Sequence, residues 1–206
     1  MNIINFKHSI IFFNLSILLI PFYLILDYEP LILCLFIILI IGVSHGSLDN
    51  IKGKRLLKLF GYKSNFLFYL IYLTISFLII ILWLILPNTI LLLFLIVASY
   101  HFGKEDTVFS FKRKFPISEI LFFFKGSSVI IAPLLFQRDA TNLIFKTLNF
   151  YVFESSFFNN QFLITFLCLG FLSSIYISNK KNIDLKALMV IDFLSLIILN
   201  FFLTPI

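Results

Sequence analysis

The sequence predicts an all-α, polytopic membrane protein with about seven transmembrane helices. Hydrophobic residues make up 61% of its 206 residues and charged residues only 13%, whereas soluble domains are about half apolar and about a quarter charged. The apolar residues form runs of about 20, the length of a helix that crosses the roughly 30 Å hydrocarbon core of a bilayer. None of these runs alternates as the strands of a membrane barrel do, so helices are expected throughout.

The spans follow one another along the whole chain and are separated by turn or helix-breaking residues. A turn at Asp27–Pro30 ends the first span, Pro87 and Asn88 separate the third from the fourth, and Gly103 and Pro116 precede the fifth. The first span lacks a small-residue cleavage site and is expected to be retained. The predicted spans are Ser9–Leu26, Leu31–Ser47, Phe66–Leu86, Thr89–Phe102, Ile117–Phe136, Phe157–Ile177 and Leu185–Leu203.

The basic residues are concentrated on one side of the predicted membrane. Of the 16 Lys and Arg residues, thirteen fall at the N-terminus or in the loops after the second, fourth and sixth spans, and two fall in the opposite loops. This bias predicts a cytoplasmic N-terminus in a multi-pass protein of the cell (inner) membrane, and it indicates topology rather than a surface for nucleic acid. Without an internal repeat or linker, residues 1–206 are expected to form a single membrane-embedded helical domain.

Two histidines near span ends are the strongest functional candidates. His45 precedes Asp49 by four residues, which would place both side chains on one helical face. His101 is followed by Glu105 and Asp106, and both histidines end spans that run toward the same side, so their depths should match. Histidine supported by carboxylates in an apolar bundle favours a metal such as iron or zinc over covalent catalysis. The alternative is a pair of interfacial histidines that only form hydrogen bonds between helices.

Lys125 in the fifth span and Asp192 in the seventh are further charged residues at membrane depth. Such residues are costly in lipid unless they face the interior of the bundle. A structural ion pair between them and a direct functional role are equally compatible with the sequence.

The two histidine motifs, Gly42–Asp49 (GVSHGSLD) and Ser99–Asp106 (SYHFGKED), resemble those of the Brp/Blh family of β-carotene 15,15'-dioxygenases. Weaker similarity continues through Lys125 to Asp192. The resemblance implies an Fe(II) enzyme of the lipid bilayer that uses dioxygen to cleave β-carotene, or a related carotenoid, into retinal. It implies that His45 and His101 are iron ligands, and Asp49 and Asp106 are the candidate catalytic carboxylates. A retinal-binding rhodopsin is a candidate recipient of the product.

The family pattern also contains two ligand histidines, four residues apart, in a segment expected to follow Ile206. None of the 3 histidines of the chain takes their place. Two alternatives to an enzymatic function therefore remain open. One is a non-catalytic membrane protein that binds a carotenoid or retinal between its helices, and the other is a truncated, inactive member of the family.

Overall fold

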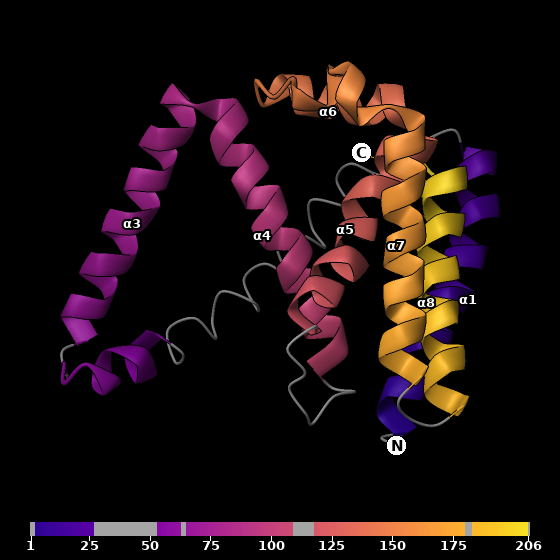
Figure 1. Cartoon of the computed structure of the whole chain (residues 1–206), viewed down its shortest axis with the longest axis horizontal. Helices are drawn as coiled ribbons and strands as arrows, with labels where there is room; N and C mark the ends of the chain where they lie inside the picture. The colour runs from indigo at the N-terminus through magenta and orange to yellow at the C-terminus, as the bar shows by residue number, and fades with distance from the viewer. Residues whose placement is uncertain (1–2, 27–52, 63–64, 109–117, 180–182, 206) are drawn as a thin grey trace. The chain divides into compact units, whose positions relative to one another are not determined.

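The computed structural model describes residues 3–26, 53–62, 65–108, 118–179 and 183–205 (Figure 1). The described residues are helical apart from short connections, and they include no strand, which confirms the predicted all-helical class. The second predicted span, Leu31–Ser47, lies outside the described residues. The chain divides into two compact units, Tyr28–Pro87 and Met1–Asp27 with Asn88–Ile206. The single domain expected over residues 1–206 stays a prediction.

In the unit Tyr28–Pro87, a short helix at residues 53–59 precedes the long helix α3 (Asn65–Ile85). Gly61 ends the short helix with a φ of 84°, and the amide of Tyr62 donates to the carbonyl oxygen of Leu57 at 3.0 Å. Glycine adopts this left-handed conformation without the cost of a Cβ atom, so Gly61 acts as a C-terminal cap.

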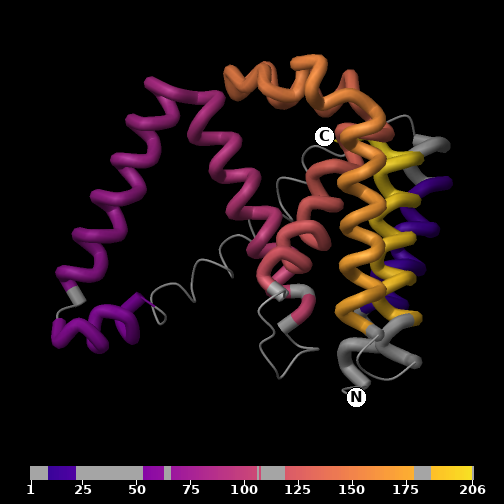
Figure 2. The backbone as a smooth tube through the Cα atoms, viewed as in Figure 1, coloured from indigo at the N-terminus to yellow at the C-terminus, as the bar shows by residue number. Residues whose placement is uncertain are grey.

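The described part of the larger unit contains six α-helices, namely α1 (Ile3–Leu26), α4 (Pro87–Val108), α5 (Ser118–Phe136), α6 (Arg138–Thr147), α7 (Asn160–Asn179) and α8 (Ile183–Phe202). Of α4, all residues except Pro87 belong to this unit. Two 3-10 turns, η1 (Val152–Glu154) and η2 (Ser156–Phe158), connect α6 to α7. Helix α7 packs against α5 and α8, and α8 packs against α1 (Figure 2).

The apolar core of this unit lies where α5, α7 and the 3-10 turns meet. Leu134 of α5, Leu163 of α7 and Phe150 are each about 1% exposed. The rings of Phe150 and Phe153 meet edge to face with their centroids 5.2 Å apart, a favourable arrangement for aromatic pairs. This cluster fixes the path of the chain from α5 through α6 into α7.

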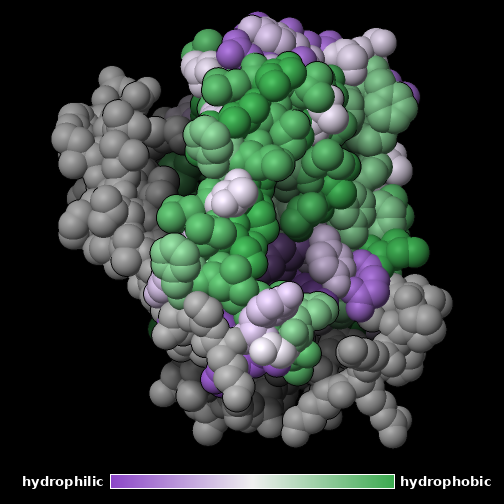
Figure 3. All heavy atoms as spheres, turned by 90° about the vertical axis from the view of Figure 1, so that its left-hand side faces the viewer, coloured by the Kyte–Doolittle hydropathy of each residue, from purple (hydrophilic) through white to green (hydrophobic). Residues whose placement is uncertain are grey.

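Among the described residues, three helices are long and apolar enough to cross a membrane, at Phe66–Ile85, Glu119–Phe136 and Asn160–Ser178. Only 6% of the apolar window of the first is buried, and its large side chains are exposed, as with Phe66 at 75% and Leu84 at 77%. Hydrophobic side chains also cover most of the described surface that faces the viewer in Figure 3. Apolar exposure on this scale is typical of a protein surface that contacts lipid. The membrane class is confirmed, and the number of seven spans stays a prediction.

Two elements differ from expectation. Helix α4 continues through Gly103 to Val108, although Gly103 was predicted to end it. The amphipathic helix α6 was not predicted, because the stretch 137–156 was treated as a connection between spans. Its apolar side chains contact the core cluster, as Phe145 does, and this burial stabilises a helix too polar to be recognised as a span.

Candidate functional site

His101 lies in α4 with a carboxylate one helical turn beyond it. Its Nε2 atom is 3.4 Å from Oε2 of Glu105, and the two side chains are 49% and 44% exposed. Side chains four residues apart share a face of a helix, and a carboxylate in this position holds an imidazole in one orientation. The extension of α4 past Gly103 creates this pair, because Glu105 would not share a helical face with His101 if the helix ended at Gly103.

The side chains of the other predicted site residues lie outside the described part of the structure. His45 and Asp49 lie in the range 27–52, outside the described residues, and Asp106 belongs to α4 while its side chain is not described. The convergence of His45 with His101 therefore stays a prediction. Glu105 was noted in the sequence but not selected, although it has the same four-residue spacing from His101 that Asp49 has from His45. That repeated spacing is the signal that would have identified it.

Two of the described side chains are of types that can bind a metal ion. Imidazole nitrogen and carboxylate oxygen are donors that suit iron or zinc, and His101 with Glu105 offers one of each. Among the described residues, no group of three or more His, Cys, Asp or Glu side chains could hold a metal ion. The geometry is compatible with His101 as one ligand and Glu105 as the carboxylate that orients it.

Helices α4 and α5 approach closely where two glycines face each other. A Cβ atom added at Gly103 would overlap the carbonyl oxygen of Phe122, and one added at Gly126 would overlap the carbonyl oxygen of Ser99. Small residues at helix contacts let backbones come together in membrane proteins. Gly103 therefore serves helix packing rather than chain reversal, which explains why α4 does not end there.

A polar contact between the same two helices adds to this packing. Lys104 Nζ donates to the hydroxyl oxygen of Tyr100 at 2.6 Å, and that hydroxyl donates to Oε2 of Glu119 in α5 through a short hydrogen bond. The ammonium group also lies 4.9 Å from the centroid of the Tyr100 ring. This chain of contacts links α4 to α5 and helps to fix the turn of α4 that carries His101.

A cavity of about 340 Å³ lies beside this turn, between α4, α5, α7 and α8. Its described lining residues include three that are ionisable, namely Glu105, Lys125 and Asp192. Two buried serines, Ser128 and Ser174, also contribute to the wall. Because Glu105 contacts His101 as well, the cavity adjoins the candidate metal ligand.

Lys125 and Asp192, the two charged residues predicted at membrane depth, line this same cavity. Lys125 Nζ is 3.3 Å from Oγ1 of Thr107 in α4 and 3.7 Å from Sδ of Met189 in α8. Asp192 Oδ2 accepts a hydrogen bond of 3.0 Å from Ser9 Oγ in α1. The two residues thus connect the cavity wall with three neighbouring helices, and both are partly buried, as charges inside a helix bundle usually are.

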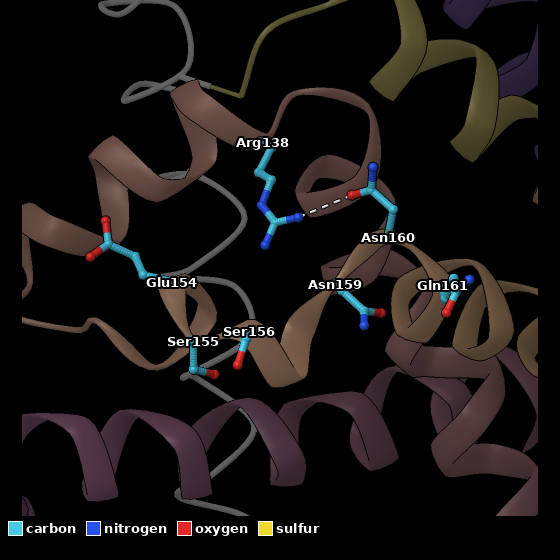
Figure 4. A pocket seen from close by; sticks show the side chains of 7 residues that line it. All are labelled: Arg138, Glu154, Ser155, Ser156, Asn159, Asn160 and Gln161. Atoms are coloured by element: carbon cyan, nitrogen blue, oxygen red, sulfur yellow. Dashed lines mark hydrogen bonds between the residues drawn. The ribbon is translucent and has the colours of Figure 1, made fainter.

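A second cavity, of about 440 Å³, lies where α6, the 3-10 turns and α7 meet (Figure 4). Arg138 donates to Oδ1 of Asn160 at 3.0 Å and to the carbonyl oxygens of Phe158 at 2.8 Å and Phe153 at 3.4 Å. Because Arg138 already donates to two backbone carbonyls and a side-chain amide, its role is to hold these segments together. This cavity contains no histidine among its described lining residues, and it is separate from the candidate metal ligand.

Comparison with known proteins gives one match. A family model described as "Beta-carotene 15,15'-dioxygenase" matches residues 36–206, a range that includes both histidine motifs and all the residues of the 340 Å³ cavity. No curated protein and no solved structure matches the chain.

Proposed function

The chain belongs to the beta-carotene 15,15'-dioxygenase family, and we propose that it is an Fe(II) enzyme that cleaves the central double bond of β-carotene with dioxygen. Membership gives it a carotenoid dioxygenase-type function. In the proposed reaction the 15,15' double bond breaks, one oxygen atom of dioxygen goes to each carbon, and two molecules of retinal form. The observation that carries this proposal is the family match over residues 36–206, which contains His101 beside a cavity in an apolar helical protein.

His45 and His101 are the proposed iron ligands. Bound Fe(II) would supply the electrons through which dioxygen becomes reactive toward the polyene. Glu105 would hold the imidazole of His101 in a fixed orientation, since its carboxylate contacts Nε2, and Nδ1 would then be the nitrogen that binds iron. Asp49, at the same spacing from His45, is proposed to do the same there. Asp106 remains a candidate for a catalytic carboxylate.

The membrane class of the protein supports a substrate delivered from lipid. A carotenoid is a hydrocarbon that dissolves in the bilayer, and apolar helices offer it a path that does not cross water. Phe102, Val129, Phe193 and Leu196 form an apolar part of the cavity wall beside Glu105, and ligand sites of this kind lie between helices of bundles. We place the enzyme in the cell (inner) membrane with a cytoplasmic N-terminus, as the charge bias of its loops indicates.

The test is expression of the full chain in cells that accumulate β-carotene, with iron supplied. Chromatography of cell extracts should show loss of β-carotene and gain of about two molecules of retinal for each one lost. The variants H45A and H101A should abolish the gain, whereas H8A, which changes the remaining histidine of the chain, should retain it. Immunoblots of membrane fractions would establish that all four proteins accumulate equally.

Unchanged pigment beside well-folded, iron-supplied protein would refute cleavage by this chain. If intact carotenoid then co-purified with the protein, the non-catalytic binding function would be favoured. Equal activity of wild type and H101A would instead refute the assignment of the ligand while leaving cleavage itself supported.

A further inference from the structure

The 340 Å³ cavity combines an apolar wall with one cationic side chain. Its volume falls at the lower end of the range for small-molecule sites, about 300–1,000 Å³. It is therefore suited to one end of a long apolar molecule rather than to a whole carotenoid. The apolar wall includes Phe102, Val129 and Leu196, and Lys125 faces the same space.

The polar lining residues differ in whether they can donate a hydrogen bond to a ligand oxygen. Ionised carboxylates such as Glu105 and Asp192 accept and do not donate. The serine hydroxyls donate to carbonyl oxygens of their own helices, Ser174 to Gly170 at 3.0 Å and Ser128 to Phe124 at 3.5 Å. Among the described lining residues, the ammonium group of Lys125 is accordingly the donor suited to an incoming oxygen.

One described contact of Lys125 is weak enough for such an oxygen to replace it. One of its partners is the thioether sulfur of Met189 at 3.7 Å, and thioether sulfur is a weak acceptor. A carbonyl oxygen is a better acceptor, and its hydrogen bond to an ammonium group is strengthened by the charge. Replacing the sulfur contact would therefore strengthen the hydrogen bonding of Lys125 while its contact to Thr107 at 3.3 Å is kept.

We propose that this cavity binds the aldehyde end of the cleavage product, with Lys125 Nζ donating a hydrogen bond to the carbonyl oxygen. The inference rests on the proposed function, because oxygenation of a carbon–carbon double bond turns each half of the hydrocarbon into an aldehyde. Glu105 lines the cavity and contacts His101, so a carbonyl formed near His101 has a short path to Lys125. The cavity thus distinguishes product from substrate, since only the product carries an acceptor for the ammonium group.

The experiment is a titration of purified, detergent-solubilised full chain with all-trans-retinal in the presence of a metal chelator. Binding without metal separates this test from the proposed catalysis. A cation at the carbonyl oxygen should shift the polyene absorption band to longer wavelength, and this shift gives the dissociation constant. The variant K125M should lose the shift and bind retinal roughly tenfold to a hundredfold more weakly, the range expected for losing a charge-assisted hydrogen bond.

The matched control is K146M. Lys146 lies in α6, pairs with Glu154 and is not among the described residues that line the cavity, so this variant should bind retinal as the wild type does. An unshifted band in the wild type, or equal shifts and affinities for wild type and K125M, would overturn the proposal.

A second pair of variants covers the case in which K125M does not fold. Val129 lines the cavity and is 44% exposed, whereas Ile120 on the same helix is 60% exposed and is not among the described lining residues. Both positions can accept a larger side chain without disturbing the core. V129F should weaken retinal binding several-fold and I120F should not, and equal binding by these two variants would place the retinal elsewhere and refute the site.

Discussion

Replacement of Gly103 by alanine tests the close packing of α4 on α5. The added methyl group would overlap three backbone atoms of α5, namely the carbonyl carbon and oxygen of Phe122 and the amide nitrogen of Gly126. Backbone atoms cannot rotate away as a side chain can, so the helices would have to separate by on the order of 1 Å to restore ordinary contact distances.

The expected cost follows from two opposing effects. Overpacking of a tight contact costs about 1–3 kcal/mol, whereas alanine in place of glycine stabilises a helix interior by about 0.5–1 kcal/mol. Because the overlap is with backbone, we place the overpacking cost near the upper end of its range and expect G103A to lose about 2 kcal/mol of unfolding free energy. The separation of the helices would also move Glu105 relative to Lys125 and weaken retinal binding.

The measurement is unfolding of the purified protein in detergent by an added denaturing detergent, followed by circular dichroism. The variant V97A serves as the control, since Val97 lies in α4 with 63% exposure and surface substitutions change stability by about 0.5 kcal/mol or less. G103A as stable as V97A, with unchanged retinal binding, would refute the close approach of α4 and α5 at this position.

Three further predictions concern other contacts. E105Q should lower carotenoid cleavage about tenfold to a hundredfold at unchanged protein level, as loss of a carboxylate that orients a metal-bound histidine does, whereas D139N on α6 should retain activity in the same chromatographic assay. R138M should lose about 1–3 kcal/mol of stability, since two partly buried carbonyl oxygens would lose a charged donor. Equal denaturation midpoints for R138M and the wild type would contradict this. The hydrogen bond from Lys146 to Glu154 (2.7 Å) raises the pKa of Lys146, so its small contribution is present below the ordinary pKa of lysine and is lost as the pH rises through the raised value. K146A should remove this alkaline step from the stability profile.

The helices themselves could largely be predicted from the sequence because each apolar run carries its own signal. Six of the seven predicted spans coincide with described helices, within a few residues at most ends. The exceptions have a shared cause. Helix α4 continues through Gly103 because of its contact with α5, and α6 is helical because of its contact with the core cluster. Packing partners of this kind cannot be read from a local sequence pattern. The charges of α6, Asp139 in its first turn and Lys146 in its last, match its dipole and could have indicated it.

The candidate site was predicted in part. His101 and its carboxylate support follow from spacing along one helix, and only the continuation of α4 identified Glu105 as the group that meets the imidazole. The companion motif at His45 and Asp49 lies outside the described residues, so its place in the site remains a prediction.

The sequence by itself determined that this is a helical membrane protein, because hydropathy can be read within each single helix. It also indicated the two histidine motifs, because side chains four residues apart share a face of one helix. Only the tertiary structure decided that Glu105, Lys125 and Asp192, from three different helices, line one cavity. The physical reason is that facing glycines set how closely α4 and α5 pack. Which side chains share a cavity depends on that packing and leaves no local pattern in the chain.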